Sequence, residues 1–166
     1  MKNKKGDFSG LVYMIVFIAA FAIFLLIIGY ITPQITTQLK SQIGTSTLIN
    51  NSLDSSTNVA AKTLPTIWLS TFVILFFGLL VTSFLVQTHP IFVPIFVILL
   101  VLAIVVSVPL SNSYQALATG ATLSGAATEQ GMIGMVMGNL PMVTFILGLI
   151  IMIVTFAKPG GRETLA

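Results

Sequence analysis

The chain has 166 residues, of which 56% are hydrophobic and only 7% charged, whereas a soluble domain carries about 25% charged residues. It contains no cysteine, which excludes a disulfide framework, a thiol nucleophile and a thiolate metal site. The net charge is +3, and no stretch is basic enough to form a nucleic-acid-binding surface. These properties indicate an integral membrane protein with a single membrane domain over residues 1–166.

The first expected element is an apolar run over residues 11–31, preceded by Lys2, Lys4 and Lys5. A transmembrane helix needs about 20 apolar residues, whereas the apolar region of a signal peptide has about 7–15 and ends at a small-residue cleavage site. A prepilin would carry a glutamate shortly after its cleavage site, but residues 9–11 here are Ser, Gly and Leu. We therefore expect a retained first transmembrane helix.

Three further apolar runs follow, at residues 67–86, 91–110 and 140–156. They are continuous rather than alternating, so they do not match a membrane barrel. Helices satisfy their own backbone hydrogen bonds in lipid, which predicts an all-α fold of about four transmembrane helices. The short link between the second and third runs predicts an antiparallel hairpin. Trp68 is expected at a membrane interface, and Pro109 near the end of the third span.

The first long connection, residues 33–64, is rich in Thr, Ser, Gln and Asn. Its apolar residues Ile35, Leu39 and Ile43 recur at every fourth position, which predicts a short amphipathic helix on the membrane surface. Turns are expected after Gly44, followed by a second short helix that begins near Asp54.

The second long connection, residues 111–139, is dominated by small residues. We expect a partly helical excursion folded back on the bundle, with Tyr114 near the membrane interface. Gly134 and Gly138 have the spacing that lets two helix backbones approach closely, although glycines at these positions could equally loosen a loop. The stretch from Met132 could also lengthen the fourth span.

The distribution of charge predicts the orientation. With four spans both termini share one side, whose basic residues are Lys2, Lys4, Lys5, Lys158 and Arg162. The opposite side carries fewer basic residues, Lys40 and Lys62. Because basic residues near span ends favour the cytoplasmic face, we expect both termini on the cytoplasmic side of the membrane.

The predicted spans carry few side chains that could take part in catalysis or transport. Between Lys62 and Glu129 there is no acidic residue, lysine or arginine, although transporters and intramembrane enzymes usually place ionisable groups there. The polar residues within the spans can bond to their own helices and are interpreted as packing residues: Ser70, Thr71, Thr82, Ser83, Ser107, Thr144 and Thr155. The lone histidine, His89, is interpreted as a turn residue. No catalytic, cofactor-binding or metal site is predicted, and we do not expect an enzyme.

The order of these segments resembles a group of small multispan proteins from viruses that enclose a lipid membrane within an icosahedral shell, of the tectivirus and corticovirus type. The resemblance covers most of the chain and rests on a short basic N-terminus, the hairpin containing "THPIF", the stretch "SNSYQALA" and the ending "FAKPGG". It implies a structural protein of the virion membrane that packs and shapes the membrane and links it to the capsid. The expected partners are the bilayer, other membrane proteins or copies of itself, and capsid proteins, without specific nucleic-acid binding.

Two alternative functions would place the protein outside the virion. A holin-like lysis protein would form lesions in the host membrane, although the weakly basic C-terminus and the length of the chain are untypical of one. A small accessory subunit of a larger membrane complex would contribute packing rather than chemistry. Presence in purified virions would identify the virion protein, an effect on the timing of lysis would identify the holin-like protein, and co-purification with large subunits would identify the accessory subunit.

Overall fold

The structure is a computed structural model that describes residues 8–43, 46–85 and 90–156, and the elements in these ranges are all helical. The long helices are α1 (Phe8–Ile43), α3 (Leu64–Leu85), α4 (Val93–Thr119) and α7 (Leu140–Phe156). The short ones are α2 (Thr47–Asn58), α5 (Ser124–Glu129) and α6 (Gly131–Gly138), with a π-helical turn η1 (Val59–Thr63) and a 3-10 turn η2 (Pro90–Phe92). The all-α prediction is confirmed.

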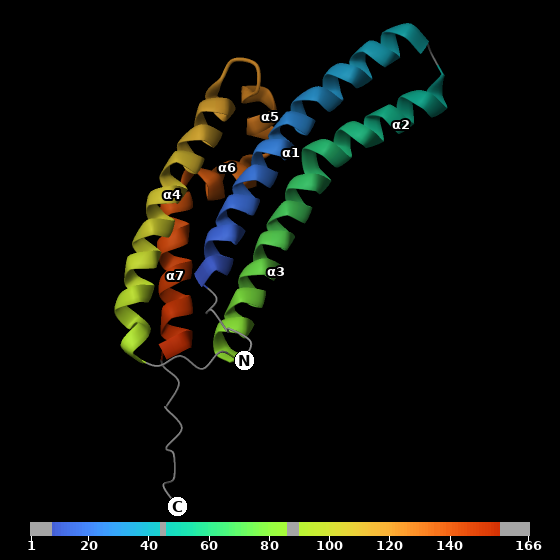
Figure 1. The fold of residues 1–166 in the computed structure, drawn as a ribbon. Helices are drawn as coiled ribbons and strands as arrows, with labels where there is room; N and C mark the ends of the chain where they lie inside the picture. The colour runs from blue at the N-terminus through green and yellow to red at the C-terminus, as the bar shows by residue number, and fades with distance from the viewer. Residues whose placement is uncertain (1–7, 44–45, 86–89, 157–166) are drawn as a thin grey trace, which may run out of the picture.

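Four of the helices form a bundle. Helix α1 packs against α3 and α4, and α7 packs against the same two helices, so that the four form a ring. Helices α1 and α4 run in one direction and α3 and α7 in the other, which places the start of α1 and the end of α7 at the same end of the bundle (Figure 1). At the opposite end, α1 and α2 extend beyond the other helices.

The bundle is apolar enough to lie in a membrane. Three helical stretches have the length and composition to cross a bilayer: Gly10–Ile43, Thr47–Leu85 and Val93–Thr119. Helices α6 and α7 together pass the same test but are bent by 70° relative to each other, so the described residues supply three spans, or four if the bent pair counts as one. Helix α3 alone is about 33 Å long, close to the hydrocarbon thickness of about 30 Å.

The core of the bundle is built around α1. Its buried side chains recur at every third or fourth position, which lines one face of a helix: Leu11, Met14, Ile15, Ile18, Ala19, Ala22, Leu25 and Leu26. Between α4 and α7, the missing side chain of Gly148 makes room for Leu100, because a Cβ at Gly148 would overlap it. Lipid is as apolar as these side chains, so close contact rather than exclusion of water stabilises such helix pairs.

The first connection differs from its prediction. Helix α1 continues past Pro33 to Ile43, and residues 47–63 are helical and lead directly into α3. The expected turns and separate surface helix are therefore replaced by two long helices side by side. A proline removes one backbone hydrogen bond but has a φ angle that suits a helix, and the hydroxyls of Thr36 and Thr37 both donate to the Pro33 carbonyl, at 2.9 and 2.8 Å.

The end of the third helix differs from the sequence-based expectation. The third helix continues beyond Pro109 to Thr119. Trp68 and Tyr114, both expected near an interface, are buried in the bundle. The indole of Trp68 finds an acceptor there, since its Nε1 donates to the Ile18 carbonyl at 3.2 Å, and a satisfied N–H removes the main penalty for burying a tryptophan. The fourth predicted span, residues 140–156, coincides with α7.

Candidate functional site: a polar arm and a broken helix

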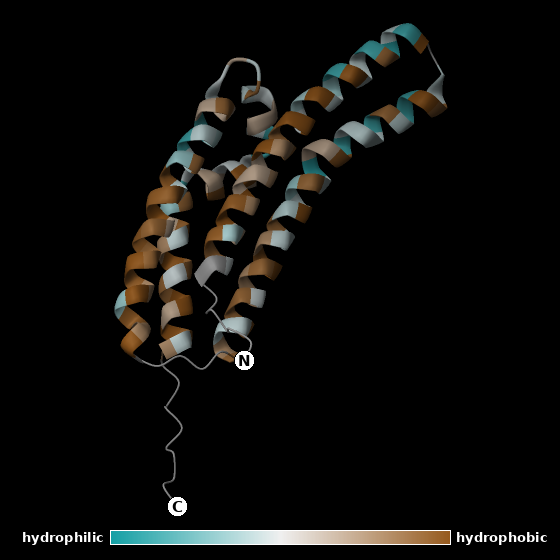
Figure 2. Cartoon of the chain, in the orientation of Figure 1, coloured by the Kyte–Doolittle hydropathy of each residue, from teal (hydrophilic) through white to brown (hydrophobic). Residues whose placement is uncertain are grey.

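The most distinctive surface of the molecule is a polar projection from the bundle, here named the arm, which comprises residues 33–43 of α1 and all of α2. It extends from the end of the bundle opposite to the start of α1 (Figure 1), and its polar residues contrast with the largely apolar bundle (Figure 2). Because the apolar residues of α1 give way to polar ones near Pro33, the arm is the part of these two helices that suits water rather than hydrocarbon.

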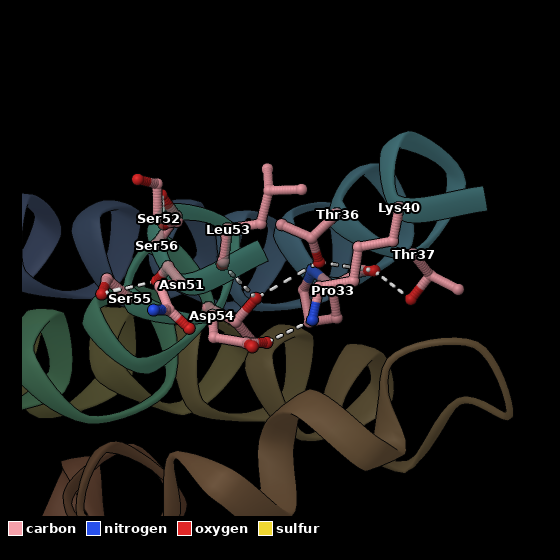
Figure 3. Close-up of polar contacts among 11 residues, drawn as sticks. Pro33, Thr36, Thr37, Lys40, Asn51, Ser52, Leu53, Asp54, Ser55 and Ser56 are labelled. Atoms are coloured by element: carbon pink, nitrogen blue, oxygen red, sulfur yellow. Dashed lines mark hydrogen bonds and ion pairs between the residues drawn. The ribbon is translucent and has the colours of Figure 1, made fainter. Parts of the chain in front are cut away.

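Polar side chains connect the two helices of the arm. The hydroxyls of Thr36 and Thr57 lie 3.2 Å apart. The Lys40 ammonium forms an ion pair with the Asp54 carboxylate (Figure 3). Lys40 and Asp54 are 36% and 61% exposed, and exposed ion pairs contribute only about 0–1 kcal/mol. The arm is therefore held together weakly by side-chain contacts.

The hydroxyls of α2 mostly bond to their own helix. Ser52, Ser55, Ser56 and Thr57 each donate to the carbonyl four residues earlier, a pattern that slightly destabilises and bends helices. Helix α2 buries no residue, and Ser, Thr and Asn are moderate helix formers. The conformation of α2 thus depends on its pairing with α1 and on its continuity with α3.

The arm also exposes aliphatic side chains. On α1 they follow the four-residue spacing seen in the sequence, and they continue onto α2: Ile35, Leu39, Ile43, Leu48 and Ile49. Exposed apolar groups within the bundle are expected to contact lipid, but the arm lies beyond the continuous apolar runs of the sequence, residues 11–31 and 67–86. Where such a surface faces water, exposed aliphatic groups that lie together are typical of an interaction site.

A second polar constellation lies where α6 meets α7. The two helices are bent by 70° there, and the regular pattern of backbone donors stops at the end of α6. Helix α4 supplies further donors, because Ser111 Oγ donates to the Met137 carbonyl at 2.8 Å and Gln115 Nε2 donates to the Gly138 carbonyl at 3.1 Å. Ser111 and Gln115 are one helical turn apart, so both reach the break from the same face. Irregular backbone in a membrane protein requires such partners.

Gln130 completes this constellation by joining the link between α5 and α6 to α1. Its side chain is 1% exposed, and its Nε2 donates to the Leu25 carbonyl at 2.8 Å. Gly29 makes room for it, since a Cβ there would overlap Gln130 Nε2. We name Ser111, Gln115 and Gln130 the polar clasp; it fixes the broken helix against both α4 and α1.

Sequence analysis did not single out the polar clasp. A signal was nevertheless present, because Ser111 and Gln115 lie one turn apart directly after an apolar span, and Gln130 follows a run of small residues. Among the polar residues that were singled out, five bond back to their own helices: Ser70, Thr71, Thr82, Ser107 and Thr155. The hydroxyls of Ser83 and Thr144 are buried and have no partner among the described residues.

The predicted packing glycines lie on α6. A Cβ at Gly138 would be 3.4 Å from Gln115 Nε2, which is ordinary contact, and one at Gly134 would be 4.0 Å from the Tyr114 hydroxyl. The tighter approaches are at Gly29 and Gly148, where an added Cβ would overlap a neighbouring side chain. A packing role for Gly134 and Gly138 stays a prediction. The basic residues Lys2, Lys4, Lys5, Lys158 and Arg162 lie outside the described residues, as does His89.

The charged groups of the described residues lie in or beside the arm. Lys40 and Asp54 belong to the arm, Lys62 to η1, and Glu129 to α5, which contacts η1. Among the residues that the structure describes, no group of three or more His, Asp or Glu side chains could hold a metal ion. The arrangement is suited to recognition through polar and aliphatic groups that carry no net charge. Comparison of the chain with protein-family models, curated proteins and solved structures gives no match.

Proposed function

We propose that this chain is a structural protein of a membrane assembly, anchored by its bundle and presenting the arm to other components. The observation that carries the proposal is the set of aliphatic side chains that the arm exposes beyond the continuous apolar runs of the sequence, Ile35, Leu39, Ile43, Leu48 and Ile49. Such groups are covered in a stable assembly. The polar clasp supports the same role, since its donors are used to hold the broken helix in place.

The assembly we propose is the internal membrane of an icosahedral virion, where the protein packs in many copies, shapes the bilayer and links it to the capsid. The sequence resemblance supports this setting. The topology that goes with it has four spans, the bent α6–α7 pair being the fourth, and both termini on the cytoplasmic side. A vesicle formed towards the cytoplasm keeps that face outward, so the basic termini would face the capsid and anionic headgroups. Each basic residue contributes about 1 kcal/mol at such a surface.

Particle fractionation tests the proposed function. Virions are separated from host membranes on a density gradient, and the chain is quantified by mass spectrometry relative to the capsid protein. We expect it in the particles in a constant ratio to capsid protein. Its absence from particles would overturn the virion role. Altered timing of lysis in a deletion strain would then indicate the holin-like alternative, and co-purification with large membrane subunits the accessory role.

The proposed topology has its own test, for which the absence of native cysteine is convenient. Asn3→Cys and Leu165→Cys are labelled separately in sealed membranes with an impermeant maleimide, with Ser52→Cys in the arm as the opposite-side control. We expect residues 3 and 165 to react from the cytoplasmic side and residue 52 from the other side. Reaction of residues 3 and 165 from different sides would rule out an even number of spans.

A further inference from the structure

Helix α1 lacks one backbone hydrogen bond at the base of the arm, where Pro33 lies within the helix. Pro33 lacks a backbone N–H, so the carbonyl of Gly29, four residues earlier, loses its usual helical partner. The hydroxyls of Thr36 and Thr37 both donate to the Pro33 carbonyl, which adds to the tendency of the helix to bend there. Sharp bends in helices are found mainly at such prolines and at π-helical turns.

The second helical segment is irregular at the same level. Between α2 and α3 the backbone changes to the π-helical turn η1, where the Leu64 N–H donates to the Val59 carbonyl five residues earlier. Helix α1 contacts η1 directly, so Pro33 and η1 lie at the base of the same arm. Short π-helical turns inside α-helices occur frequently at functional sites.

A groove lies beside the contact between α1 and η1. The groove, of about 360 Å³, lies between α1 and the α2–η1 segment, lined by Ile28, Thr32, Ser55, Ser56, Val59, Ala60 and Leu64. Close packing would resist any change of angle between the helices, whereas a groove at this position leaves room for one. Beyond it, polar side chains connect the two helices of the arm: Thr36 contacts Thr57, and Lys40 pairs with Asp54 (Figure 3).

We infer that the arm is hinged: it rotates as one body about Pro33 and η1, and the groove narrows or widens as it does so. The arm extends about 16 Å beyond Pro33. A rotation of about 20°, the size of a helix kink, therefore moves its tip by about 6 Å. This inference rests on the proposed function in one respect, since the rotation would set the direction in which the arm presents Ile35, Leu39 and Ile43 to a partner.

Distance measurement between spin labels tests the hinge in the full-length protein in lipid nanodiscs. One pair, Gln42→Cys with Ala116→Cys, joins the arm to α4 of the bundle; a matched control pair, Gln38→Cys with Ser52→Cys, lies within the arm. All four positions are exposed. We expect the arm-to-bundle distances to spread over about 6 Å more than the control distances. Equally narrow distributions for both pairs would overturn the hinge.

Two variants establish whether the spread arises at the base of the arm. Pro33→Ala restores a donor for the Gly29 carbonyl, and we expect it to narrow the arm-to-bundle distribution. Independently, Thr32→Cys and Ser56→Cys, which line opposite sides of the groove, are joined by a short bis-maleimide in otherwise native protein, which should also remove the spread. A spread that persists in the linked protein would place the motion elsewhere and overturn the inference. These measurements do not depend on virions, so failure of the hinge and failure of the proposed function are distinguishable.

Discussion

The bundle and the arm share continuous helical backbone, because α1 runs through both and α2 leads through η1 into α3. In the bundle, α1 buries a side chain at every third or fourth position, and α4 closes on α7 at Gly148. In the arm, α2 buries no residue, and polar contacts connect it to α1. The same helix thus passes from a region held by close packing to one connected by a few polar side chains.

This difference has an energetic basis. In lipid, helices gain nothing from excluding water, so their association depends on many van der Waals contacts between well-fitted surfaces. In water, a polar pair exchanges its hydrogen bonds with solvent and contributes little net free energy. Substitutions that disturb packing in the bundle should therefore have larger effects than substitutions that remove polar contacts in the arm.

The largest effect is expected for Gly148→Val in the bundle. The added side chain would overlap Leu100 and separate α4 from α7, and overpacking of this kind costs about 1–3 kcal/mol. The matched control is Gly78→Val on α3, where an added Cβ meets nothing within 4 Å. We expect the thermal unfolding midpoint of detergent-solubilised protein to fall for Gly148→Val and to change little for Gly78→Val. Equal losses would contradict the packing account.

A smaller loss is expected for Gly134→Leu and Gly138→Leu. The side chain of a leucine at residue 138 would extend towards Gln115, which donates to the Gly138 carbonyl, and we expect a cost of about 1 kcal/mol. Ser83→Ala and Thr144→Ala remove buried hydroxyls and should destabilise less. Thermal unfolding of the four variants compares them directly. If all four are neutral, the glycine pair faces lipid or solvent rather than a packed helix.

The third prediction concerns the polar clasp. Ser111→Ala removes the hydroxyl that donates to the Met137 carbonyl at 2.8 Å, and side-chain hydrogen bonds in membrane proteins contribute about 0.6 kcal/mol on average. Ser113→Ala changes an exposed serine on the same helix and serves as the control. We expect a modest decrease in unfolding free energy for the first variant alone. An equal response of the two would show that the broken helix does not depend on this bond.

The smallest effect is expected in the arm. In a double-mutant cycle with Lys40→Met and Asp54→Asn, the coupling energy should be below about 1 kcal/mol and should decrease with added salt, because both groups are exposed. Amide hydrogen exchange should accelerate in α2 and not in the bundle, since α2 has no buried residue to protect it. Faster exchange throughout α3 would mean that the arm and the bundle unfold together.

The sequence by itself determined the class and most helices of this protein. Continuous apolar runs at residues 67–86 and 140–156 correspond to α3 and α7, because a helix in lipid satisfies its own backbone and needs only enough apolar length. The polar composition of residues 33–64 likewise distinguished this segment from the apolar runs. These properties are local, so they can be read from consecutive residues.

Only the tertiary structure decided which polar groups find partners and where the helices end. Pro33 could have ended α1, but the helix continues to Ile43, where Thr36 contacts Thr57 and Lys40 pairs with Asp54. Gln130 reaches a carbonyl on α1 that is 105 residues away in the chain. Such contacts depend on the relative position and rotation of distant helices, which the period of a single apolar run does not specify.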